Sequence, residues 1–255
     1  MSLEFPPCED VRLGKSPLTE VICQIRFDPI LSIAEIPAGF QDQVRGRFPK
    51  FEWEQPITMQ VPDPQSESGS ISVQVAPRTS KFSTASGDST ISLATNFAAL
   101  STSGYTVWED FAHDVQLMLE AVQTVYGPLS IVRVGLRYLN VLSAVKLGLA
   151  GRQELLDLVN PSLFTPLGTT PWRDFNTYQS ALVIDDDENT LAFRFGFQED
   201  ADGANVLLDL DYFRESAIAS DTNLVPLLEG FHQRIYLAFR WSIREGRLNV
   251  FEPAQ

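Results

Sequence analysis

The segment PLTEVICQIRF, residues 17–27, alternates apolar and polar side chains, and PLSIVRVGLRY, residues 128–138, repeats that pattern without a gap. Proline, leucine, valine and arginine are identical in place, and phenylalanine is exchanged for tyrosine at the last position. Alternation with a period of two residues is typical of a strand that buries one of its faces. We therefore predict that the same half-buried strand opens each half of the chain.

The elements expected after these two strands follow a similar order in both halves. Hydrophobic periodicity, with glycine and proline as breaks, sets their expected bounds. The first half contains a short helix with Phe40, Val44 and Phe48 on one side, strands at 57–61, 71–75, 81–84 and 91–100, and a long helix at 108–126. The second half contains a short helix at 153–159, strands at 178–184, 191–197 and 206–213, and a long helix at 224–243. A repeated order of elements indicates an internal duplication.

The two long helices support this duplication, because Glu109-Asp110-Phe111 lies over Glu229-Gly230-Phe231 at a similar offset. We predict an α+β fold of two β-α-β-β-β-α repeats, residues 12–126 and 127–250, packed as one compact unit. An antiparallel sheet with one apolar face covers that face with helices, so a pseudo-twofold arrangement is expected. The sequence leaves open whether the sheets of the two halves join.

The composition is that of an ordinary globular protein, with 44% hydrophobic residues in a chain of 255. No apolar run approaches the roughly 18 to 20 residues that span a bilayer, and the first residues, MSLEF, have no signal-peptide pattern. We therefore expect a cytoplasmic protein. Cys8 and Cys23 are too few for a disulfide framework, and we expect neither to be bridged.

The chain is acidic, because 19 basic and 33 acidic residues give a formal charge of 19 − 33 = −14. Binding of duplex nucleic acid or of an anionic membrane requires clustered lysine and arginine, so neither partner is expected. Two interpretations of the charge stay open. The charge can serve solubility alone. Alternatively, it can provide an acidic surface that binds a basic protein partner or that imitates nucleic acid.

Three short motifs also characterise the sequence: Ser16-Pro17-Leu18-Thr19-Glu20-Val21, Tyr105-Thr106-Val107-Trp108-Glu109-Asp110-Phe111 and Leu136-Arg137-Tyr138-Leu139-Asn140. Together they resemble a sporadically distributed bacterial family of proteins of similar length and unknown function. The resemblance covers about residues 12–145 by motif and the whole chain by length. The resemblance implies a bacterial, cytoplasmic setting, and it supplies no catalytic residue.

Metal and cofactor motifs are missing from the sequence. His113 and His232 are the only histidines, and neither belongs to a zinc-binding pattern. The acidic run 185–188 fits a solvated hairpin turn better than a calcium loop, because Thr190 stands where an EF-hand loop needs glycine. Phosphate-binding loops and a nucleophile elbow are also absent. We expect no metal and no cofactor, although paired carboxylates for glycoside chemistry stay open.

The polar side of the two opening strands provides the candidate site. If the apolar residues face the helices, Glu20, Gln24 and Arg26 point to the other face, as Arg133 and Arg137 do in the second half. Guanidinium groups bind phosphate and carboxylate through paired hydrogen bonds, so the three arginines could form an anion site. The alternative is that they form cross-strand ion pairs with Glu20 and other acids.

Two functions from different classes follow from these observations. The first is a non-enzymatic acidic protein that binds another protein, for example as an antitoxin-like or immunity-like inhibitor. The alternative is a binding protein or enzyme that acts on a phosphorylated or carboxylated small molecule through the arginine-bearing sheet face. The acidic charge and the missing catalytic motifs favour the first.

Overall fold

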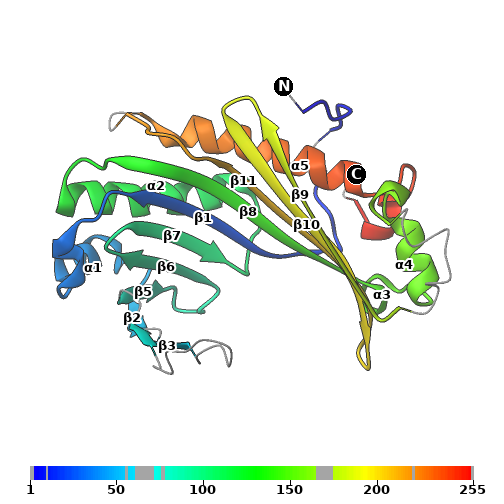
Figure 1. The fold of residues 1–255 in the computed structure, drawn as a ribbon, viewed down its shortest axis with the longest axis horizontal. Coiled ribbons are helices and arrows are strands. Elements are labelled where there is room, and N and C mark those ends of the chain that lie inside the picture. The colour runs from blue at the N-terminus through cyan, green and yellow to red at the C-terminus, as the bar shows by residue number, and fades with distance from the viewer. Residues whose placement is uncertain are drawn as a thin grey trace, which may run out of the picture.

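A computed structural model describes residues 3–9, 11–54, 57–60, 72–75, 78–164, 175–219 and 222–253. The fold is α+β, with one nine-stranded antiparallel sheet and helices packed against one of its faces (Figure 1). The strands of this sheet lie in the order β2-β5-β6-β7-β1-β8-β11-β10-β9. Their bounds are β1 Leu18–Phe27, β2 Lys50–Glu54, β5 Thr79–Ser83, β6 Ser89–Ala94, β7 Phe97–Thr102, β8 Ile131–Ser143, β9 Thr177–Asp186, β10 Asn189–Asp200 and β11 Gly203–Arg214. A separate two-stranded sheet joins β3 (Ile57–Gln60) to β4 (Ser72–Val75).

The two opening strands meet in the middle of the large sheet. β1 pairs with β8 in antiparallel register, so that Val21 lies opposite Tyr138 and Cys23 opposite Leu136. On its other side β1 pairs with β7, and β8 pairs with β11. In each half, therefore, the first strand lies beside the last strand that precedes the long helix. The sheets of the two halves join into one, which settles the question that the sequence left open.

The helices cover the apolar face. Their bounds are α1 Ala38–Val44, α2 Trp108–Tyr126, α3 Ala144–Leu147, α4 Arg152–Leu158 and α5 Leu224–Ser242, with 3₁₀ turns at Leu31–Ala34, Pro161–Leu163 and Leu248–Phe251. α2 packs on β7, α5 packs on β8 and β11, and α1 packs on α2. In Figure 1 the strands pass in front of α2 and α5. In Figure 1, no helix within the described ranges lies in front of the strands, on the opposite face of the sheet.

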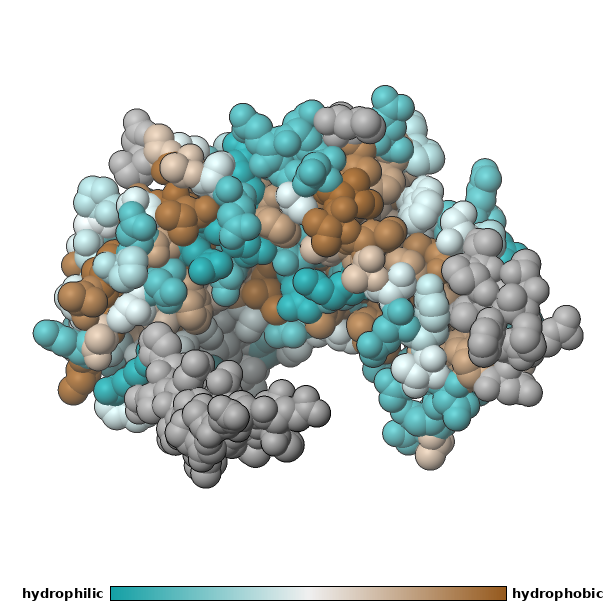
Figure 2. All heavy atoms as spheres, in the orientation of Figure 1, coloured by the Kyte–Doolittle hydropathy of each residue, from teal (hydrophilic) through white to brown (hydrophobic). Residues whose placement is uncertain are grey.

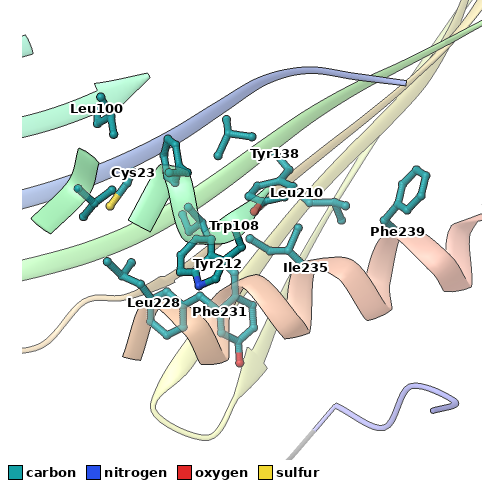
Figure 3. Close-up of a cluster of buried hydrophobic side chains, with 14 of the residues drawn as sticks. Cys23, Leu100, Trp108, Tyr138, Leu210, Tyr212, Leu228, Phe231, Ile235 and Phe239 are labelled. Atoms are coloured by element: carbon teal, nitrogen blue, oxygen red, sulfur yellow. The ribbon is translucent and has the colours of Figure 1, made fainter. Parts of the chain in front are cut away.

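The core forms where the long helices meet the strands. Leu228, Phe231 and Ile235 of α5 project toward Leu210 and Tyr212 of β11 (Figure 3). Phe231 and Tyr212 meet edge to face, with ring centroids 5.0 Å apart. These three α5 residues are spaced three and four positions apart, so they lie on one side of the helix.

Most expected elements are confirmed, and α2 has the predicted bounds. Gly127 ends α2 with a backbone φ of 85°, a conformation that glycine adopts without strain. The prediction of one strand at 91–100 is wrong, because a two-residue turn at Thr95 and Asn96 divides it into β6 and β7. β2 and α3 were not predicted, and α1 ends at Val44 although Phe48 still reaches the core. The segment between the strands predicted at 57–61 and 71–75 lies outside the described residues.

Two further expectations concern disulfide bonds and membrane-spanning helices. Cys8 and Cys23 form no disulfide, and Cys23 is fully buried in β1. Burial raises the pKa of the Cys23 thiol to about 12, which keeps it in the unreactive protonated form. Within the described residues, no helix is long and apolar enough to cross a membrane.

Candidate functional site

The five predicted site residues all lie on the sheet face opposite the helices. Their strands bury the alternate residues, for example Ile25 of β1 and Leu136 of β8, against the helices. Arg26 lies directly opposite Arg133 across the β1–β8 pair. Figure 2 shows hydrophilic side chains gathered over the middle of the molecule, in the orientation in which the strands lie in front. We call this surface the open face.

Arg137 and Arg194 share one carboxylate on the open face. Arg137 donates from Nε to Oδ1 of Asp209 over 2.7 Å and from Nη2 to Oδ2 over 2.6 Å. Arg194 of β10 donates to the same Oδ2 from the other side, over 3.4 Å. Two parallel hydrogen bonds between guanidinium and carboxylate are the strongest geometry for such a pair. The pKa of Arg137 is raised mainly by its hydrogen bonds to Asp209.

Arg133 forms a second network on the open face, with Asp211 and Gln24. Its Nη2 donates to Asp211 over 3.2 Å, and its Nη1 donates to Gln24 over 3.5 Å. Its guanidinium also lies 4.3 Å from the ring centre of Phe213, a cation–π contact. Gly135 makes room for this arrangement, because a Cβ there would lie 2.8 Å from Nη1 of Arg133. The side chain of Arg133 therefore lies across the strand rather than pointing to solvent.

Arg26 and Glu20 differ from the other three predicted residues. Arg26 is exposed, and within the described part of the chain it makes no ion pair or hydrogen bond through its side chain. Glu20 contributes a favourable charge interaction to Arg137 without a hydrogen bond to it. The structure thus places cross-strand ion pairs at Arg133 and Arg137 and leaves Arg26 outside them.

Asp209 lies deeper than the two arginines that share it. The side chain of Asp209 is 5% exposed, whereas those of Arg137 and Arg194 are 38% and 50% exposed. Burial raises the pKa of Asp211, and the nearby charges of Arg133, Arg137 and Arg194 only partly offset that effect. Above Asp209, solvent therefore meets guanidinium groups first, whereas Arg133 and Asp211 are similarly buried, with 14% and 17% of their side chains exposed.

A hollow of 630 Å³ lies beside the networks, over β8 to β11. Asp209 and Arg194 form one side of it, and Leu207, Gln179 and Gly196 form its floor and far side. A side chain at Gly196 would place its Cβ 2.5 Å from the carbonyl oxygen of Tyr178, so glycine allows the backbones of β9 and β10 to approach closely here. The volume is within the usual range for a small-molecule site, although the hollow is a shallow one on a sheet face.

The acidic run in the β9–β10 hairpin is only partly solvated. Asp185 and Glu188 are exposed, as the sequence predicted for the turn. Asp186 is instead buried, and it accepts hydrogen bonds from the hydroxyl of Tyr212 and the backbone N–H of Leu3. The pKa of Tyr212 is raised, chiefly by burial and then by this bond. Among the residues that the structure describes, no group of three or more His, Cys, Asp or Glu side chains could hold a metal ion.

Sequence reasoning did not identify Asp209, Asp211 and Arg194, which complete the networks. The signal was present, because both aspartates alternate with apolar residues in 206–213 and Arg194 stands between Phe193 and Phe195. The missing information was the pairing of β8 with β11, which joins segments about 70 residues apart, for example Arg137 and Asp209.

The chain matches no protein-family model and no curated protein at a significant level. The bacterial family resemblance therefore stays a prediction.

Proposed function

We propose that the open face binds an acidic segment of another protein and that the chain acts as a non-enzymatic interaction module. One observation carries this proposal: Arg137 and Arg194 are 38% and 50% exposed, while the carboxylate of Asp209 that they share is buried beneath them at 5%. Such a surface is locally positive in a protein whose formal charge is −14. A carboxylate from a partner can add to a half-exposed guanidinium without displacing the internal pair, because guanidinium has five N–H donors.

Apolar side chains beside the arginines support a protein partner. Leu207 in the hollow and Val183 on the edge strand β9 are both exposed, with 40% and 74% of their surface accessible. Interfaces between proteins combine such apolar contacts with arginine, which is enriched among their strongest contacts. The arginines require only that the segment in contact with the open face is acidic. They do not require that the whole partner is acidic. Antitoxin-like or immunity-like inhibition is one form of this function.

Affinity capture from a native bacterial host tests the proposal with the wild type and three variants at physiological salt. The wild type and Arg45→Glu, an exposed charge reversal at the end of α1, are expected to recover the same stoichiometric partner. Arg26→Glu and Arg194→Gln are expected to lose it, because each removes positive charge from the open face. Recovery of the partner by both open-face variants, or of no stoichiometric partner by the wild type, would overturn the proposal.

A second candidate function is supported by Arg26, whose guanidinium has no ion-pair partner among the described residues. Together with the adjacent Arg133 it could bind a small phosphorylated or carboxylated molecule. A thermal-shift screen with nucleotides, polyphosphate and organic acids separates this function from the first. Under this second function an anion raises the melting temperature of the wild type, and both Arg137→Lys and Arg26→Gln reduce that increase. Lysine lacks the planar fork of arginine, and glutamine lacks its charge. Under the first, no anion in the screen has such an effect.

We also propose that the two halves, residues 12–126 and 127–250, arose by duplication and are related by a pseudo-twofold axis between β1 and β8. The shared pairing of each first strand with the last strand of its half supports this relation. In that arrangement Arg26 and Arg137 are equivalent residues on one face, which is consistent with a binding surface built from both halves.

A further inference from the structure

The three sequence motifs that carry the family resemblance meet at one cavity on the helix side of the sheet. Residues 16–18 of the first motif, residues 105–109 of the second, and Tyr138 and Asn140 of the third all line it. The cavity has a volume of 420 Å³, which is within the range of small-molecule sites. It lies on the opposite side of the sheet from the open face, so it is separate from the proposed protein-binding surface.

One wall of the cavity is aromatic and held in place by hydrogen bonds. The rings of Trp108 and His232 are stacked, with centroids 4.8 Å apart and an angle of 3° between their planes. Nδ1 of His232 lies 2.7 Å from the hydroxyl of Tyr138, which in turn donates to the hydroxyl of Tyr105 over 3.4 Å. Trp108 and Tyr138 both lie beside α5 in Figure 3. Rings fixed in this way provide a flat, preformed surface for another ring.

The N-terminal arm forms a second wall. Val11 and Leu13 line the cavity from a segment that crosses α5 without regular secondary structure. The arm is fixed by Tyr236 of α5, whose hydroxyl accepts from the backbone N–H of Val11 over 2.9 Å and donates to the carbonyl of Glu9 over 3.0 Å. Backbone hydrogen bonds of this kind place the arm without depending on the sequence of its side chains.

The charged groups of the cavity are mainly acidic. Glu109 and Glu229 contribute two carboxylates, against the single guanidinium of the exposed Arg12. Asn140 is 4% exposed, and its Nδ2 donates to the carbonyl of Leu208 over 3.3 Å. Its Oδ1 accepts no hydrogen bond from any described residue, so it can accept one from a ligand. A molecule that complements these groups donates hydrogen bonds and carries positive charge.

We propose that this cavity binds a small organic amine that bears a ring. The ring packs against the Trp108 and Tyr138 wall, and the ammonium group lies between the carboxylates of Glu109 and Glu229. Ammonium groups are stabilised both by carboxylates and by the faces of nearby tryptophan and tyrosine rings. The N-terminal arm closes the outer side over the bound molecule.

Three probes with the same indole ring test the charge preference: tryptamine is cationic, tryptophol is neutral and indole-3-acetate is anionic. Isothermal titration of the full chain is expected to show one tryptamine bound per protein, weaker binding of tryptophol and weakest binding of indole-3-acetate. Glu229→Gln and Glu109→Gln keep the shape of the side chain and are each expected to weaken tryptamine binding at least about tenfold. Neither substitution is expected to change tryptophol binding appreciably, because the neutral probe lacks the charge.

Glu120→Gln on the exposed side of α2 is the matched control, since it removes the same charge from the same helix away from the cavity. It is expected to leave tryptamine binding unchanged. Arg26→Glu on the open face is also expected to have no effect, so the two proposals can fail separately. Equal binding of the three probes, preference for indole-3-acetate, or absence of tryptamine binding would each overturn the amine site.

Discussion

On the helix side of the sheet, β8 places Val134, Leu136 and Tyr138 in the apolar core, whereas on the open side the same strand places Arg133 and Arg137 beside two aspartates. The first side gains stability from the removal of apolar surface from water. The second side must offset the cost of dehydrating charges with their mutual attraction, and such pairs often contribute little net stability.

This difference assigns separate roles to the two faces. A sheet of this size is already held together by its strand pairing and by the core beneath α2 and α5. Apolar residues in place of Arg137 and Asp209 would pair across the strands about as well, but they would expose a larger apolar surface. The charged networks therefore fit the binding surface that we propose better than they fit a role in the stability of the fold.

The largest effect is expected from truncation of the helix side. Phe231→Ala and Phe111→Ala remove side chains that are almost fully buried under the sheet, and each should lower the free energy of unfolding by about 3 to 5 kcal/mol. Leu207→Ala on the open face removes an already exposed side chain and should cost much less. Urea denaturation of the three variants checks the contrast. A near-neutral result for either phenylalanine would contradict its assignment to the core.

The helix side was also the part of the molecule that the sequence predicted best. Regular spacing of apolar residues located α2 and α5, and alternation located β1 and β8, because one buried face imposes a period on the residues that form it. The turn at Thr95 and Asn96 was not predicted, because it contains neither glycine nor proline and lies within an apolar run.

The open face was predicted only as a list of polar side chains. Alternation showed that Arg133 and Arg137 point away from the core, but their partners depend on which strands are neighbours. Asp209 became adjacent to Arg137 through a pairing of distant segments that no local pattern encodes. The cavity at Trp108 and His232 was missed for the same reason, because its walls come from four separate parts of the chain.

An intermediate effect is expected when the shared carboxylate of the open face is neutralised. Asp209→Asn keeps the size of the side chain but leaves Arg137 and Arg194 without their common counter-charge. The expected loss is about 1.5 to 3 kcal/mol, the usual range for a hydrogen bond to a charged group, since both arginines can still turn to water. Glu188→Gln is the control, because its ion pair with Arg214 is largely exposed and should contribute under about 1 kcal/mol. Equal effects of the two substitutions in urea denaturation would contradict the special role of Asp209.

The smallest effect, and the one whose sign matters most, is expected from Asp211→Asn as the pH changes. Burial raises the pKa of Asp211 above its ordinary value of 3.8, despite the attraction of Arg133. The folded state therefore holds this proton more tightly than the unfolded state does, and the resulting stability is present below the unfolded pKa and lost as the pH rises through the folded pKa.

Asparagine at this position stays neutral at every pH, so Asp211→Asn removes that loss. Its stability relative to the wild type should increase as the pH is raised from below 3.8 to neutrality, as measured by urea denaturation of both proteins across the series. If the wild type instead gains on the variant over that range, Arg133 stabilises the ionised carboxylate more than burial penalises it. The open face would then contribute to stability through its charges as the helix side does through its apolar residues, and the contrast between the two faces would be lost at this position.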